Sequence, residues 1–245
     1  MDRPRPRKQP FSKPPLRVQT TTLWEYPSQH YGDEIQGDKN YVGATPSYVI
    51  WNVLQRYSRP GDLVLDPMCG SGTTLDVARD LGRRARGFDL APHRADIERA
   101  DARKLPVESG TVDVVFIDPP YSDHIKYSDD ARCIGKVSAY DSKFYQEMKK
   151  VFAECLRVTR PGGVLAVYVC DYFERKKGLA PVGFGLFSVL TLWFEPIDIV
   201  AVVRHNKALD KGNFHQAAER DNFFLRGFNY LLLARKPREP DSRRR

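Results

Sequence analysis

The chain has 245 residues, 41% of them hydrophobic and 29% charged, which fits one α/β domain with its own core and excludes a fibrous or largely disordered protein. The net charge of +8 is concentrated at the two ends. The four cysteines form no CxxC pair or Cys/His cluster, and no apolar run reaches membrane-spanning length, so we expect a cytoplasmic protein with reduced thiols, no metal and no membrane partner.

The two ends of the chain are basic. Residues 1–17 hold six basic residues against one acidic residue, without an apolar period, which predicts a disordered arm. Residues 236–245 are predicted to be a basic tail, and residues 18–235 to be one domain. Such ends either recruit a polyanion or only aid solubility, and the sequence leaves both interpretations open.

Strands alternate with helices through the predicted domain. The aromatic, turn-rich residues 21–46 predict an ordered irregular segment lying across a core. This alternation predicts a doubly wound, mostly parallel sheet, closed by a final antiparallel strand. Helices are expected at residues 47–57, about 70–81, 144–158 and 182–192, strands at 63–66, 85–89, 97–100, 112–117, 164–169, 197–203 and 223–234, and a polar loop at 204–222.

The first constellation of site residues is the run from Asp66 to Thr74, Asp-Pro-Met-Cys-Gly-Ser-Gly-Thr-Thr. It joins a predicted strand to a predicted helix, where open α/β sheets bind ligands, and its glycines allow close approach of a ligand. The run lacks the third glycine of a dinucleotide site and the Gly-Lys-Ser/Thr of a P-loop. It therefore favours a nucleoside ligand without a pyrophosphate over a purely structural turn.

Two further acids follow neighbouring strands. Asp89 ends the second strand, where a carboxylate accepts hydrogen bonds from ribose hydroxyls. Asp101 follows the short third strand, where it either accepts from an adenine amino group or is a surface turn residue. The linker between these two acids is too short for a full crossover helix, which puts the adenine role of Asp101 in doubt.

The third constellation is Asp118-Pro119-Pro120-Tyr121, which follows the clearest strand. The prolines hold the chain rigid and aim two acceptors, the Asp118 carboxylate and the Pro119 carbonyl, into the crevice, with Tyr121 as a stacking face. Acceptors beside a ring suit a base that carries an amino group. The acceptors would pyramidalise the amino nitrogen and free its lone pair for attack on a sulfonium methyl group.

Together these motifs resemble the S-adenosylmethionine-dependent amino-methyltransferases of nucleic acids, the DNA N4-cytosine and N6-adenine methylases of the Asp-Pro-Pro-Tyr type. The resemblance covers residues 42–235 and implies a Rossmann-like class I methyltransferase, with a catalytic set from Asp118 to Tyr121. Carbon-5 methylation is excluded because Pro119 is not followed by a cysteine nucleophile. The implied cofactor-binding residues are Thr45, Asp66, Pro67, Cys69, Gly70, Gly72, Thr73, Thr74, Asp89 and Asp101.

The loops 122–142 and 204–222 are the candidates for the substrate side. No large block remains for a target-recognition domain, which weakens the DNA interpretation, because structured RNA presents unpaired bases that are recognised by shape. DNA is the first expectation and RNA cytosine N4 the second, ahead of a non-catalytic cofactor-binding module or a protein methyltransferase, and the oligomeric state stays open. The candidate substrate-binding residues are His124, Lys126, Tyr127, Arg204, His205 and Asn206.

Overall fold

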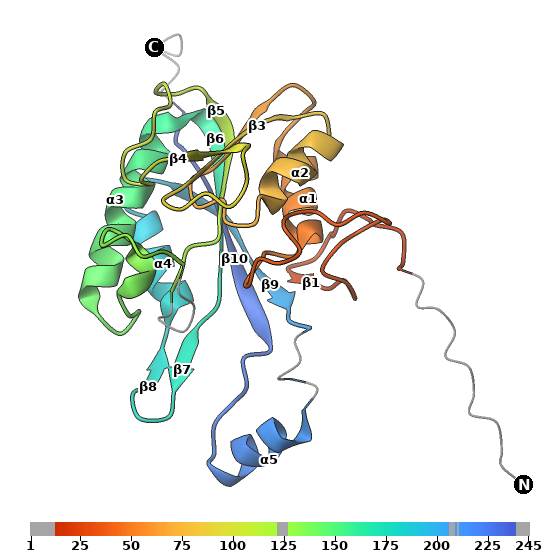
Figure 1. The fold of residues 1–245 in the computed structure, drawn as a ribbon, viewed down its shortest axis with the longest axis vertical. Helices are drawn as coiled ribbons and strands as arrows, with labels where there is room; N and C mark the ends of the chain where they lie inside the picture. Colours follow the sequence, from red (N-terminus) through yellow and green to blue (C-terminus); the bar gives the residue numbers. More distant parts are fainter. Residues whose placement is uncertain (1–12, 122–126, 206–208, 210, 239–245) are drawn as a thin grey trace, which may run out of the picture.

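The computed structural model describes residues 13–121, 127–205, 209 and 211–238. An eight-stranded sheet in the order β1-β9-β10-β6-β5-β2-β3-β4 forms its centre, with helices on both faces (Figure 1). The strands are β1 (Leu23–Trp24), β2 (Leu63–Asp66), β3 (Arg84–Asp89), β4 (Ile97–Arg99), β5 (Val112–Ile117), β6 (Thr159–Val169), β9 (Glu195–Val203) and β10 (Phe228–Arg235). The helices are α1 (Ser47–Tyr57), α2 (Thr73–Asp80), η1 (Ile134–Lys136), α3 (Ser142–Val158), α4 (Val182–Leu190) and α5 (Gly212–Arg220).

The sheet confirms the predicted doubly wound class. Strands β4, β3, β2, β5 and β6 are parallel neighbours. Strand β10 inserts antiparallel between β6 and β9, as expected for the final strand. No helix joins β3 to β4, in agreement with the short linker between Asp89 and Asp101.

Alternation along the central strands builds two cores, one on each face of the sheet. In β5, Val115 and Ile117 face the layer of α3 and α4, whereas Val114 and Phe116 face the layer of α1 and α2. Because successive strand side chains point to opposite faces, the part of a strand that is covered on both faces is apolar, and this explains the unbroken apolar run from Val114 to Ile117. Helix α3 is capped by Asp141, whose side chain accepts from the Lys143 backbone N–H.

The basic ends differ from expectation where they meet the domain. Residues 13–17, assigned to the disordered arm, lie against the body, because Leu16 packs on the α1 face and the Lys13 ammonium donates to the Gly32 carbonyl at 2.7 Å. Likewise, the Lys236 ammonium donates to the Leu156 and Thr159 carbonyls at 2.7 and 2.8 Å. Residues 13–17 and Lys236 therefore contact the domain, and residues 1–12 and 239–245 lie outside the described part.

Five elements of the described part of the chain were not predicted, namely β1, η1, β7 (Tyr172–Glu174), β8 (Gly178–Ala180) and α5. Strands β7 and β8 form a two-stranded hairpin that follows β6. Helix α5 lies within the expected loop 204–222, and the last strand begins at Phe228 instead of Phe223. The hairpin and α5 both extend beyond the lower end of the sheet in Figure 1.

Within the described residues, no helix is long and apolar enough to cross a membrane. The same part of the chain contains no group of three or more His, Cys, Asp or Glu side chains placed to hold a metal ion.

Candidate active site

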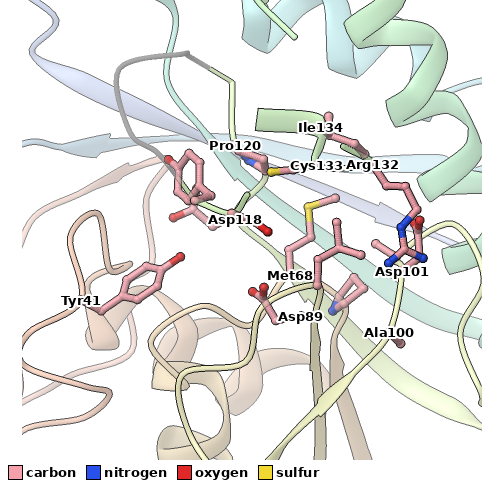
Figure 2. A pocket seen from close by; sticks show the side chains of 15 residues that line it. Tyr41, Met68, Asp89, Ala100, Asp101, Asp118, Pro120, Arg132, Cys133 and Ile134 are labelled. Atoms are coloured by element: carbon pink, nitrogen blue, oxygen red, sulfur yellow. The ribbon is translucent and has the colours of Figure 1, made fainter. Parts of the chain in front are cut away.

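The site lies at the topological switch point of the sheet. Strand β2 is flanked by β3 and β5, and the carboxyl ends of these strands carry Asp66, Asp89 and Asp118, at the edge where open α/β sheets bind ligands. Two adjoining open cavities of about 560 and 400 Å³ occupy this edge. Both are lined by Tyr41, Met68, Asp118 and Tyr127, and Figure 2 shows the larger one with Asp89 and Asp118 on its wall.

The loop between β2 and α2 forms the smaller cavity. Asp66 is buried and accepts from the Thr74 hydroxyl at 2.5 Å and from the Met68 backbone N–H at 3.1 Å. Burial raises the pKa of Asp66 to about 7, against the effect of these hydrogen bonds. Gly72 has φ +79°, and a Cβ there would lie 2.6 Å from the Arg94 guanidinium, so this turn requires glycine.

Asp89 connects the end of β3 to this loop. Its carboxylate accepts from the Gly70 N–H at 3.1 Å and from the Ala91 N–H at 2.9 Å, and it lines the larger cavity. Asp101 also lines that cavity, but Arg103 donates to both of its oxygens at 2.8 and 2.6 Å. Burial opposes ionisation of Asp101, yet the Arg103 hydrogen bonds outweigh it and hold the pKa below its ordinary value.

Asp118 lies on the wall that both cavities share. It accepts a hydrogen bond from the Thr45 hydroxyl at 2.6 Å. Burial raises its pKa to about 7, while the Thr45 hydrogen bond lowers it, the nearby Asp66 carboxylate raises it and the Arg204 charge lowers it. A carboxyl group in this position changes its ionisation near neutral pH, and such behaviour is typical of functional sites.

Tyr121 lines neither cavity and packs against the core on the α3 and α4 face. Burial raises the pKa of its hydroxyl, and the charges of Asp118, Cys170 and Arg204 also act on it. The Arg204 guanidinium lies 3.0 Å from the Cys170 sulfur. Asp118 therefore lines the two cavities and also interacts electrostatically with Tyr121 and Arg204. We call the group of Tyr121, Cys170 and Arg204 the tyrosine side.

Nine of the ten predicted cofactor-binding residues line the two cavities, and the exception is Gly72. Of the predicted catalytic residues, Asp118 and Pro120 line a cavity, whereas Pro119 is buried beside them. Among the predicted substrate residues, Tyr127 lines both cavities and Arg204 lies on the tyrosine side. His205 contacts Glu25 at 3.2 Å, and His124, Lys126 and Asn206 lie outside the described residues.

Residues 36–45, which we call the strap, were not predicted to line the site beyond Thr45. Backbone N–H groups of the strap donate to α2 and to the loop before it: Gly37 to the Asp76 carboxylate of α2 at 2.7 Å and Asp38 to the Ser71 carbonyl of the loop at 2.8 Å. The Tyr41 ring lies 2.8 Å from the position that a Cβ on Gly70 would take. The aromatic and glycine residues of this segment were the available signal, but only the fold places them over the loop.

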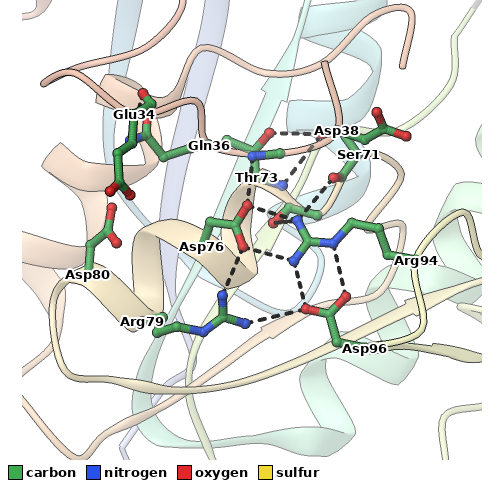
Figure 3. A network of polar contacts seen from close by, with 12 residues as sticks. Glu34, Gln36, Asp38, Ser71, Thr73, Asp76, Arg79, Asp80, Arg94 and Asp96 are labelled. Carbon is green, nitrogen blue, oxygen red and sulfur yellow. Dashed lines mark hydrogen bonds and ion pairs between the residues drawn. The ribbon is translucent and has the colours of Figure 1, made fainter. Parts of the chain in front are cut away.

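An ion-pair network holds the strap and the loop together (Figure 3). Arg94 donates to both oxygens of Asp76 at 2.8 Å and to Asp96 at 2.6 and 2.9 Å. Burial opposes the charge on Asp76, but hydrogen bonds from Arg94 and from the Gly37 N–H outweigh it and lower its pKa. Because Asp76 joins Arg94 to the strap, the network fixes one wall of the smaller cavity.

The residues of the two cavities fit S-adenosylmethionine. Asp89 offers acceptors for ribose hydroxyls, and Leu90, Ala102 and Ile134 offer an apolar wall for a purine ring. The smaller cavity is polar, with the Asp66 carboxylate suited to an amino-acid ammonium group. The donor and acceptor set therefore matches an adenosine joined to an amino acid.

Comparisons with known proteins agree with this chemistry. Residues 3–99 match the model of the N6/N4 methyltransferase family, described as DNA methylase. The type II methyltransferase M1.MboII of Moraxella bovis is 35% identical over 71 residues, 28% of this chain and 27% of that protein. The malonyl-[acyl-carrier protein] O-methyltransferase of Serratia marcescens is 27% identical over 118 residues, 44% of this chain and 38% of that protein. A geranyl diphosphate methyltransferase in complex with S-adenosylmethionine shares the fold, with a TM-score of 0.51, 17% identity and coverage of 78% and 85% of the two chains.

The chain shares its fold with S-adenosylmethionine-dependent methyltransferases of known structure, and the residues of its two cavities fit that cofactor. In sequence, residues 3–99 are similar to the DNA N6/N4 methylase family. The chain spans between about a quarter and two-fifths of the length of these curated relatives. The family match ends before Asp118, so the role of the Asp-Pro-Pro-Tyr run is argued only from its position in the structure.

Proposed function

We propose that the protein transfers a methyl group from S-adenosylmethionine to an exocyclic amino group of a nucleic-acid base, cytosine N4 or adenine N6, with DNA as the first substrate to test and RNA as the second. The observation that carries the proposal is the position of Asp118, on the wall shared by both cavities and beside the tyrosine side. Buried free thiols at all four cysteines support a cytoplasmic location.

The cofactor would supply an electrophilic methyl group on a positively charged sulfur. The Asp118 carboxylate would accept a hydrogen bond from the target amino group and draw the nitrogen lone pair out of the ring. It would stabilise the positive charge on that nitrogen as the N–C bond forms and the S–C bond breaks. With a pKa of about 7, Asp118 is suited to accept the proton that the methylated nitrogen then loses.

The decisive experiment measures methyl transfer from labelled cofactor to separate DNA, RNA and protein fractions. We expect label in a nucleic acid and N4-methylcytosine or N6-methyladenine in the digested product by mass spectrometry. Asp89→Ala should lose cofactor affinity by calorimetry, by roughly 1.5–3 kcal/mol for a charge-assisted hydrogen bond, whereas Asp118→Asn should retain it. Label confined to protein, or 5-methylcytosine as the product, contradicts the proposal.

A further inference from the structure

The β7–β8 hairpin and residues 212–228, with α5, form one aromatic protrusion beyond the sheet (Figure 1). The rings of Phe173 and Phe223 stack with centroids 5.4 Å apart and an interplanar angle of 13°. The Arg175 guanidinium lies 5.2 Å from the Phe223 ring centre and pairs with Asp221 at 2.7 Å. Stacked rings and this ion pair therefore fix the hairpin against the segment that follows α5.

A third open cavity, of about 500 Å³, lies where this protrusion joins β10. Its wall includes Phe224, 83% exposed, and Phe228, 42% exposed. Phe228 lies edge-on to Tyr230 with centroids 5.0 Å apart, and the Tyr230 hydroxyl donates to Asp171 at 3.1 Å. Exposed aromatic side chains gathered at a cavity indicate a binding site more than a packed core.

The polar groups of this cavity suit a nucleotide. The Arg226 Nε is buried without a hydrogen-bond partner among the described residues, and its guanidinium lies 5.9 Å from the Phe173 ring centre. Asp171, which also lines the cavity, adds a negatively charged carboxylate acceptor. The Arg226 Nη2 donates to the Phe224 carbonyl at 2.7 Å, which leaves Nε as a free donor of this cation within the described part of the chain. An aromatic face, a cationic donor and an acceptor are the groups that hold an unstacked base and its phosphate.

Backbone contacts connect this cavity to the tyrosine side of Asp118. The Arg204 N–H donates to the Gly227 carbonyl at 2.9 Å, and the Cys170 thiol donates to the Phe228 carbonyl at 3.5 Å. The donors of these two hydrogen bonds, Arg204 and Cys170, belong to the tyrosine side. Residues 171–180 and 204–228 also carry eight basic side chains against five acidic ones, which favours a polyanion.

We propose that the third cavity holds an unpaired nucleotide next to the target base, so that the substrate is a single-stranded or splayed stretch of nucleic acid instead of an intact duplex. The inference rests on the proposed function and names its substrate class. A base that stacks on Phe224 must have left the stack of its own helix, because the ring occupies the face that a neighbouring base would cover.

The test is binding of fluorescent 12-nucleotide probes by anisotropy, with single-stranded DNA, single-stranded RNA and duplex DNA of one sequence. We expect the 245-residue chain to bind a single strand at least about tenfold more tightly than duplex, and Phe224→Ala to remove about tenfold of that affinity. Phe224→Tyr keeps the ring and should bind as wild type. Phe214→Ala is the matched control, since Phe214 is an exposed ring on α5 outside the cavity.

Equal affinity of wild type for duplex and single strand, or equal effects of Phe224→Ala and Phe214→Ala, overturns the inference. The DNA and RNA arms tell which strand the cavity prefers. Parallel methyl-transfer assays separate the two proposals. If methyl transfer to nucleic acid occurs but binding does not depend on Phe224, only the assignment of the third cavity is wrong. If binding depends on Phe224 but no methyl group is transferred to any nucleic acid, only the proposed activity is wrong.

Discussion

At the scale of single residues, two effects act in opposite directions on the ionisation of Asp118. Burial favours the neutral acid, whereas the proposed role in methyl transfer needs the charged carboxylate. The Thr45 hydroxyl and the Arg204 charge offset part of the burial cost, and the result is a pKa of about 7. Protonation of this one carboxyl group should therefore control turnover around neutral pH.

We expect kcat to rise with pH through about 7 and then to level off, because the active form is the deprotonated one. Asp118→Asn keeps an oxygen acceptor but lacks the charge, so kcat should fall on the order of a hundredfold and the rise should disappear. A pH series of single-turnover rates at saturating cofactor measures both effects.

Thr45→Val is the companion variant. It removes the hydrogen bond that lowers the Asp118 pKa, so the rise should move to higher pH. Asp66 also has a pKa of about 7, and its titration should appear in cofactor affinity instead. An unchanged profile in Asp118→Asn would assign the pH dependence to another group.

The site acids could be predicted because their placement follows from a simple rule: parallel strands that end together bring the residues after them together. Asp66, Asp89 and Asp118 are placed in this way. Tyr41 and Arg94 could not be placed, because both come from irregular segments whose position depends on contacts with α2 and its loop. The roles of the site residues in binding and catalysis stay predictions.

At the scale of elements, the network of Arg94, Asp76 and Asp96 should act on the strap. The Arg94 and Asp76 side chains are only 21% and 18% exposed, so Arg94→Ala leaves a partly buried acid without its partner, at about 1–3 kcal/mol. We expect a Tm loss of roughly 2–4 °C per kcal/mol and weaker cofactor binding. Thermal melts and calorimetry measure these changes.

Arg79→Ala provides the control, because Arg79 pairs with the same Asp76 but is 67% exposed. Exposed pairs contribute about 0–1 kcal/mol, so its Tm and cofactor affinity should stay near wild type. Equal effects of the two substitutions would mean that Arg94 stabilises only the surface and does not position the strap.

Long, strongly patterned elements were predicted well. The bounds of α1, β2 and β5 match the expected 47–57, 63–66 and 112–117, because their apolar patterns are set locally. Strand β6 begins at Thr159, five residues early, since Thr159 pairs with Val112 across a register shift. The strands β1, β7 and β8 are only two or three residues long, too short to show an alternating pattern, and β1 also pairs with β9, which is distant in sequence.

At the scale of the whole molecule, the basic arm should provide non-specific affinity for nucleic acid. Since residues 13–17 pack on the domain, the informative deletion is residues 1–12, which hold four of the arm's basic residues. Deletion should reduce the log–log salt dependence of probe binding by roughly 0.7–0.9 per lost phosphate contact. An unchanged slope in the truncated protein means that the arm contributes solubility alone.

The strap also has a consequence for the order of events in time. Tyr41 contacts the loop between β2 and α2, Asp38 is bonded to that loop, and Gly37 is bonded to Asp76 of α2. We therefore expect opening of these contacts to accompany the exchange of spent for fresh cofactor. Lid opening often limits turnover in such enzymes. We expect a burst of product equal to the enzyme concentration, followed by a slower steady rate, in rapid-quench measurements. Arg94→Ala, which loosens the strap, should raise that steady rate relative to the burst, and a linear time course without a burst would show that exchange is not limiting.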